Sequence, residues 1–173
     1  MRPVLLIPAL AIPIMLSAVV FKTATAETPL SIVDRYGVDL AAYATVRRTD
    51  GTYRRMLISP EALGIGSGDA LPDGTRILME TYYRPGEVST VFHKQKVDGR
   101  WQYGSFPASR PNLSVAPRAS CLACHGRASD TDFTFTLPSV WSAASGTGPS
   151  DFTCDRGGRS PCGSRVYLDG ARQ

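Results

Sequence analysis

The chain has 173 residues, with 19 lysines and arginines against 15 aspartates and glutamates, which gives a formal net charge of +4. This small imbalance, with no basic run interleaved with aromatic residues, excludes the usual pattern of a nucleic-acid-binding protein. A weakly basic surface still suits docking to an acidic redox partner.

The N-terminal segment has the pattern of an export signal. Arg2 gives a basic start, residues 4–20 are almost wholly apolar, and residues 24–26 supply the small side chains that signal peptidase requires. Two prolines interrupt the apolar run, which is short for a membrane span, although an uncleaved anchor remains the alternative. We therefore predict a signal peptide at 1–26, cleaved after Ala26, and a periplasmic protein that keeps 147 of the 173 residues, enough for one domain.

The first part of the mature chain combines several local patterns. Residues 34–48 carry apolar side chains at spacings that suit a helix or an irregular lead-in. The turn signal at 50–51 precedes an extended segment over 52–58, and a proline begins a short helical turn over 60–63. Residues 64–74 are rich in Gly, Ser, Asp and Pro, so we expect a surface loop there.

Three strands in succession are predicted next. Residues 75–83 are rich in β-branched and aromatic side chains, which is typical of a strand. Residues 88–97 and 101–106 are separated by Asp98-Gly99-Arg100, a good hairpin connection. Residues 107–118 contain three prolines and cannot form regular structure, so they are expected to link this antiparallel sheet to the next segment.

Residues 121–125 read Cys-Leu-Ala-Cys-His, the pattern that attaches a c-type haem. A spacing of three on a helix places Cys121 and Cys124 on a common face, where both thiols can form thioethers with vinyl groups. The next residue is rotated by about 100°, so His125 leaves that face and can bind the iron as the proximal ligand. The pattern therefore predicts one covalent haem c, held by Cys121, Cys124 and His125.

Two other interpretations of this cysteine pair are open. The pair could be redox-active, or it could belong to a zinc site. Zinc would require a fourth ligand, for which the candidates are Cys154, Cys162 and His93. The export signal favours haem, because haem c is attached on the outer side of the bacterial inner membrane.

The C-terminal stretch 141–173 is rich in Gly and Pro, so we expect a loop-rich extension of a haem domain at 27–140. It contains Cys154 and Cys162, eight positions apart across a Gly-Gly turn. With the other two cysteines bound to haem, these are the thiols left in an oxidising compartment, which favours a disulfide. Closing so short a loop would stabilise the fold by roughly 2.5 kcal/mol in the chain-entropy model.

Several short motifs follow one another in a distinctive order: LPDGT at 71–75, ILME at 77–80, WQY at 101–103, CLACH at 121–125 and DFTFT at 132–136. Over about residues 50–137 this order resembles the cytochrome P-460 family, which includes the hydroxylamine-oxidising cytochromes P-460 and the cytochromes c-prime-beta. The resemblance implies an α+β fold, mainly an antiparallel β-sheet with a few short helices that pack a covalently bound haem. It also implies a five-coordinate iron with an open distal side, often in a homodimer.

One position departs from the family pattern. Catalytic members carry a lysine, bonded to the haem edge, directly before the glutamate of the Gly-Thr strand. The matching residue here is Met79, in front of Glu80. The lysines of the mature chain, Lys94 and Lys96, lie on the following strand and do not align with that position. The resemblance therefore implies the haem fold without the cross-link, and it supports hydroxylamine oxidation less.

Strand alternation predicts which residues line the pocket. Ile77, Met79 and Thr81 share one strand face. If the family's cross-link position points towards the haem, all three of these side chains point towards it. Met79 could fill the core, line an apolar distal pocket, or ligate the iron opposite His125. His93 could be a solvated strand residue, a distal group or a catalytic base.

Two aromatic residues and a lysine complete the candidate surroundings of the haem. Trp101 and Tyr103 share a strand face and are expected in the sheet core or against the haem. On the preceding strand Lys94 and His93 point to opposite faces, and the sequence does not decide which of them points inward.

We therefore expect an exported mono-haem c-type cytochrome that binds or processes small nitrogen-containing ligands such as nitric oxide, or that carries single electrons. An apolar distal pocket favours neutral ligands, because nothing in it stabilises an anion. The alternatives are a hydroxylamine-oxidising enzyme and a six-coordinate His/Met electron carrier, and the sequence assigns no catalytic residue. A non-haem binding module held by disulfides is a third class.

Overall fold

The computed structural model describes residues 30 and 32–170, and the predicted signal peptide at 1–26 lies outside them. The elements of the described residues are, in chain order, β1 (Ile32–Arg35), β2 (Val38–Arg48), β3 (Tyr53–Ile58), η1 (Pro60–Gly64), β4 (Arg76–Arg84), β5 (Glu87–Val97), β6 (Arg100–Pro107), α1 (Ala119–His125), η2 (Gly126–Thr131), α2 (Leu137–Ala144), β7 (Ser150–Cys154) and α3 (Ser164–Gly170). Within the described residues, no helix is both long and apolar enough to cross a membrane.

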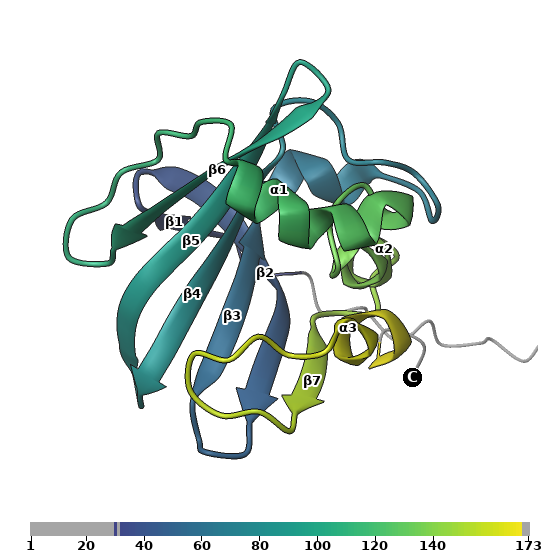
Figure 1. Ribbon diagram of the computed structural model, residues 1–173. Helices are drawn as coiled ribbons and strands as arrows, with labels where there is room; N and C mark the ends of the chain where they lie inside the picture. The colour runs from purple at the N-terminus through teal and green to yellow at the C-terminus, as the bar shows by residue number, and fades with distance from the viewer. Residues whose placement is uncertain (1–29, 31, 171–173) are drawn as a thin grey trace, which may run out of the picture.

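A single β-sheet organises the fold. Strands β1 to β6 pair with their chain neighbours in antiparallel order, and β7 pairs in parallel with β2. The helices α1, α2 and α3 gather on one face of this sheet (Figure 1). The predicted α+β class, with a mainly antiparallel sheet and a few short helices, is therefore confirmed.

The three predicted strands at 75–106 are confirmed as β4, β5 and β6. The turn between β5 and β6 is formed by Asp98 and Gly99, with φ angles of 50° and 71°. Two consecutive positive φ angles are what a tight hairpin turn requires, and Asp-Gly adopts them at little cost. The local turn chemistry was therefore sufficient to predict this hairpin.

The expectation of a helix or an irregular lead-in at 34–48 is wrong, because these residues form most of the hairpin β1–β2. The strand β2 is largely buried, and its register with β3 shifts between Ala42 and Ala44. Before the shift Leu40 packs on one face of the sheet, and after it Val46 packs on the other. This bulge breaks the two-residue alternation, so the apolar spacing looks like that of a helix.

The sheet carries a hydrophobic cluster on each face. The inner core consists of Leu40, Leu57, Leu78, Val91 and Phe106. The helix-side core includes residues of the sheet, of α2 and of α3, and Cys121 of α1 packs against it; among its buried residues are Met56, Ile77, Trp101, Tyr103, Leu137, Val140 and Tyr167. The Tyr36 ring lies 5.3 Å from the Phe106 ring, so the turn after β1 reaches β6 and the sheet curls around its inner core.

The C-terminal stretch adds a strand and a helix that its composition did not indicate. Strand β7 extends the sheet beside β2, and Phe152 and Tyr167 join the helix-side core. The predicted disulfide is confirmed, because Cys154 and Cys162 are bonded to each other. It fastens the end of β7 to the segment that leads into α3.

Replacing Cys154 and Cys162 together by serine is expected to lower the free energy of unfolding by about 2.5 kcal/mol, because the unfolded chain regains the entropy of an open loop. Urea unfolding of the oxidised wild type and the variant would measure this difference. The wild type under reducing conditions is the matched control, and it should lose a similar amount. Equal midpoints for all three samples would contradict a stabilising role for this disulfide.

Candidate haem site

The linker after β6 delivers the CLACH segment to the helix side of the sheet. Ala116 and Tyr103 exchange two backbone hydrogen bonds of 2.9 and 3.1 Å. Arg118 Nε donates a further hydrogen bond of 3.2 Å to the Tyr103 carbonyl. Ala116 and Arg118 lie shortly before α1, so these contacts fix the start of the helix against the middle of β6.

The helix α1 carries both free thiols of the described chain on one turn. Cys121 is half-buried and packs against the helix-side core, whereas Cys124 is exposed. Arg127 donates a hydrogen bond of 3.3 Å to the Cys124 sulfur. The predicted helical turn is confirmed, since both cysteines lie on α1.

His125 is the last residue of α1, and its tautomer follows from its hydrogen bond. Its Nδ1 lies 2.9 Å from the Phe133 carbonyl oxygen, which can only accept, so Nδ1 carries the proton. Burial, and then the charge of Lys94, lower the pKa of His125, which favours the neutral ring. A neutral ring with a proton on Nδ1 has its lone pair on Nε2, and this is the form in which histidines bind metals.

Aromatic residues hold the His125 ring in place. The Tyr103 ring centroid lies 5.3 Å from that of His125, and the Phe135 centroid lies 5.7 Å away on a different element. Phe135 in turn lies 6.2 Å from Tyr167 of α3. The packing therefore connects the end of α1 to both β6 and the C-terminal helix.

The loop that supplies the Phe133 carbonyl is anchored by Asp132. Both residues have left-handed backbone conformations, with φ of 50° and 54°, which is unusual outside glycine. The Asp132 carboxylate accepts hydrogen bonds from Lys96 Nζ at 3.0 Å and from the Leu71 backbone N–H at 3.1 Å. Sequence reasoning treated DFTFT only as a family motif and did not assign this anchor.

Lys94 is the least expected member of the site, because it is buried at 5% exposure on the helix side of the sheet. Its Nζ donates to the Phe133 carbonyl at 2.9 Å and to Thr134 Oγ1 at 2.5 Å. It also lies 3.8 Å from the centroid of the Trp101 ring, a cation–π contact. Burial lowers the pKa of Lys94 to about 7. Lys94, and not His93, therefore points to the helix side of the sheet, a choice that strand alternation alone did not decide.

His93 lies on the opposite face of the sheet. It is a register partner of Leu78, its ring is 5.4 Å from that of Phe106, and it is 4% exposed. A side chain at Gly104 would collide with the His93 ring, so the burial of His93 depends on this glycine. The expectation of a solvated histidine is wrong. As His93 belongs to the inner core, it is also not a partner of His125 across one haem.

The zinc interpretation loses its candidate ligands. Cys154 and Cys162 are bonded to each other, and His93 is separated from the CLACH segment by the sheet. Among residues 30 and 32–170, no group of three or more His, Cys, Asp or Glu side chains is arranged to hold a metal ion. The donor set of α1 is instead two thiols and one imidazole, which fits a covalently attached haem.

The three predicted pocket residues of β4 divide into two groups. Ile77 and Met79 pack in the same helix-side cluster as Cys121, and Met79 is paired in register with Met56. Thr81 instead forms hydrogen bonds within the sheet. Its hydroxyl donates to the Thr90 carbonyl at 2.7 Å and accepts from the Thr90 N–H at 3.1 Å. Its hydrogen-bonding capacity is therefore used at the register shift between β4 and β5.

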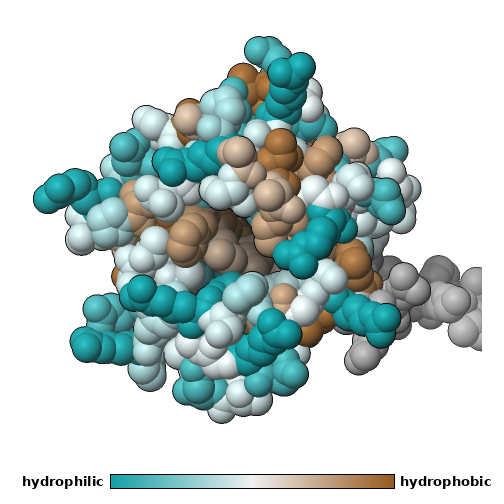
Figure 2. Space-filling model, in the orientation of Figure 1, coloured by the Kyte–Doolittle hydropathy of each residue, from teal (hydrophilic) through white to brown (hydrophobic). Residues whose placement is uncertain are grey.

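A hollow with apolar walls lies on the face that carries the helices (Figure 2). Comparison with Figure 1 places it over the strands, between α1 and the segment that leads into α3. This is the side of the sheet on which Met79, Cys121 and Tyr103 pack. The hollow offers a flat ligand a floor of strands and a wall of helix.

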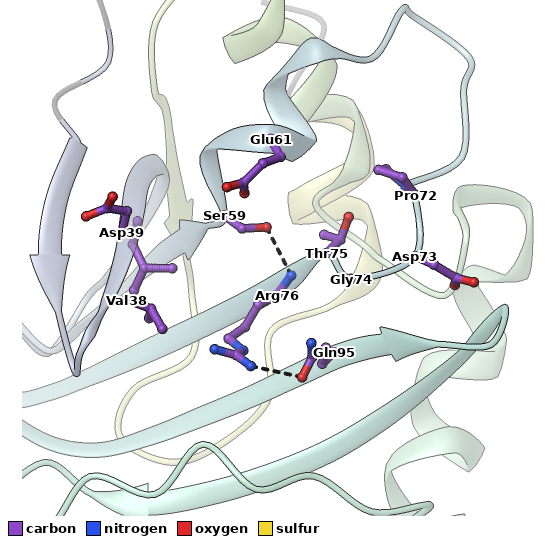
Figure 3. A pocket seen from close by; sticks show the side chains of 11 residues that line it. Val38, Asp39, Ser59, Glu61, Pro72, Asp73, Gly74, Thr75, Arg76 and Gln95 are labelled. Atoms are coloured by element: carbon purple, nitrogen blue, oxygen red, sulfur yellow. Dashed lines mark hydrogen bonds between the residues drawn. The ribbon is translucent and has the colours of Figure 1, made fainter.

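A separate cavity of about 430 Å³ opens beside the inner core. Val38 and Asp39 lie on one side of it, and Arg76 and Gln95, joined by a hydrogen bond of 3.0 Å, lie on the other (Figure 3). It contains no residue of the CLACH segment, so it is not part of the candidate haem site.

Comparisons with family models, curated proteins and solved structures find no match to this chain.

Proposed function

We propose that the chain is an exported mono-haem c-type cytochrome of the P-460 type, without the lysine cross-link. Cys121 and Cys124 would hold the haem as thioethers, and His125 would bind its iron through Nε2. The hydrogen bond from His125 Nδ1 to the Phe133 carbonyl carries this proposal, because it favours the tautomer in which the Nε2 lone pair is available to a metal.

A periplasmic location belongs to the same proposal. A disulfide between Cys154 and Cys162 supports it, because such bonds persist in oxidising compartments and are rare in the cytosol. The signal-like segment at 1–26 supports it as well. Removal of this segment would deliver the chain to the side of the membrane where haem c is attached.

Bound haem would supply a redox-active iron with one axial position open to a small molecule. The protein's part is to hold the His125 ring and to surround the site with apolar side chains, of which Ile77, Met56 and Met79 lie on the helix side. These three side chains carry no group that would pair with an anion. They favour a neutral ligand such as nitric oxide.

A six-coordinate electron carrier is the second candidate, and the methionines favour it. Met56 and Met79 are register partners on neighbouring strands and pack in the same cluster as Cys121. A thioether from either could occupy the second axial position of the iron. Hydroxylamine oxidation has less support, because Met79 stands where the cross-linking lysine of the catalytic members would be.

Expression with a cytochrome c maturation system, followed by spectra of the ferrous protein with and without nitric oxide, tests the proposal. We expect covalent haem, a five-coordinate ferrous spectrum and direct binding of nitric oxide. A six-coordinate spectrum that becomes five-coordinate in Met79→Ala or Met56→Ala would instead establish the electron carrier. A colourless protein whose mass equals that of the polypeptide would overturn both candidates.

A further inference from the structure

The carbonyl oxygen of Phe133 accepts two hydrogen bonds. One comes from His125 Nδ1 and one from Lys94 Nζ, and both donor–acceptor distances are 2.9 Å. A carbonyl oxygen has two lone pairs, so it can serve both donors. The two donors nevertheless draw on the electron density of the same oxygen. The candidate iron ligand and a buried lysine are therefore coupled through one backbone atom.

Several groups hold the Lys94 amine in this position. Trp101 lies under it, Thr134 accepts its second hydrogen bond, and the Thr134 hydroxyl donates in turn to the Asp132 carbonyl at 3.0 Å. Asp132 is fixed by its ion pair with Lys96. Because the lysine is buried, it does not exchange this contact for solvent. The hydrogen bond from Lys94 to the Phe133 carbonyl is thus part of the folded core.

We propose that Lys94 is a positioning residue that raises the reduction potential of the haem by sharing the Phe133 carbonyl with His125. This inference rests on the proposed function. A carbonyl that already accepts from an ammonium group is a weaker acceptor for the imidazole N–H. His125 then gains less basicity from that hydrogen bond and donates less strongly to the iron.

The charge of Lys94 acts in the same direction. A buried cation near His125 would disfavour the more positive ferric state of an iron bound there, since charges interact strongly where water is excluded. Both effects favour ferrous iron, the state that binds neutral diatomic ligands most readily. Lys96 does not have the same effect, because its charge is paired with the Asp132 carboxylate at 3.0 Å.

The test compares the haem-loaded wild type with Lys94→Met, which keeps the length of the side chain but removes its donor and its charge. At pH 6, below the pKa of about 7, the wild-type amine is a cation. We expect Lys94→Met to have a lower reduction potential by redox titration. We also expect a higher iron–histidine stretching frequency by resonance Raman spectroscopy of the ferrous protein.

Two further variants separate this role from a merely structural one. Lys94→Arg restores a cationic donor and should recover most of both shifts. Arg76→Met removes a cation on the inner face, beside Gln95 and away from Phe133, and should leave the stretching frequency unchanged. If Lys94→Met does not fold, Lys94→Gln replaces it, since the amide is uncharged and a weaker donor, and its potential should also fall.

Unchanged potential and frequency in a haem-loaded Lys94 variant would overturn the inference and leave the proposed function standing. Equal shifts in the Lys94→Met and Arg76→Met variants would overturn it too, because a general charge effect would then be sufficient. A wild type that binds no covalent haem would remove the proposed function itself.

Discussion

Replacement of both Cys121 and Cys124 by alanine is expected to abolish covalent haem attachment while the fold remains intact. Cys124 is exposed and Cys121 is half-buried, and within the described part of the chain the one hydrogen bond to either thiol is that from Arg127 to Cys124. Their truncation therefore creates no large cavity and orphans no buried polar group. After expression with the maturation system, haem staining on a denaturing gel and the intact mass would measure the attachment.

The double variant Cys154→Ser/Cys162→Ser is the matched control, because it removes the same number of sulfur atoms and lies outside the CLACH segment. It should keep its haem even though it is less stable. Staining that persists after the loss of Cys121 and Cys124, or that disappears equally in the control, would contradict thioether attachment. Circular dichroism would show whether each variant is folded.

Local chemistry was sufficient to predict β4 to β6, and it failed where contacts are remote. The Asp98-Gly99 turn and the alternation of Ile77 to Met79 are properties of neighbouring residues. Strand β2 was missed because a bulge at Ala42 changes which face its apolar side chains occupy. Strand β7 has a polar composition and exists through its parallel pairing with β2, about a hundred residues earlier.

The candidate site shows the same difference between features set by neighbouring residues, which could be predicted, and features set by distant contacts, which could not. The three residues of the attachment motif lie within one five-residue segment, so their spacing predicted the helix that carries them. The burial of Lys94 could not be predicted, because its partners Phe133 and Thr134 lie 39 and 40 residues further along the chain. The burial of His93 equally depends on the absence of a side chain at Gly104, on the next strand.

Glu80, which follows Met79 in the family motif, is also placed by the alternation of β4. Its carboxylate is fully buried on the inner face, where it accepts hydrogen bonds of 2.7 Å from Tyr36 and from Tyr82. It also forms an ion pair of 2.6 Å with Arg35. Burial, and then the hydrogen bond to Glu80, raise the pKa of Tyr36 to about 12, so this phenol remains a donor at neutral pH. Glu80 thus connects the first hairpin to the middle of the sheet, on the side away from the candidate haem.

Replacement of Glu80 by alanine is expected to lower the free energy of unfolding by about 3 kcal/mol, because the phenols of the buried Tyr82 and the partly buried Tyr36 lose their acceptor, at about 1–3 kcal/mol for a buried donor. Arg35 is partly exposed and can be hydrated, so it adds little. Glu80→Gln retains an acceptor and should lose less. Glu87→Ala removes an exposed carboxylate from the pair with Arg84 and should change the stability by less than about 0.5 kcal/mol.

Urea unfolding would rank the three variants. An equal loss in Glu80→Ala and Glu87→Ala would show that the Glu80 cluster does not hold the hairpin, whereas a large loss without loss of haem would separate the stability of the sheet from the attachment site.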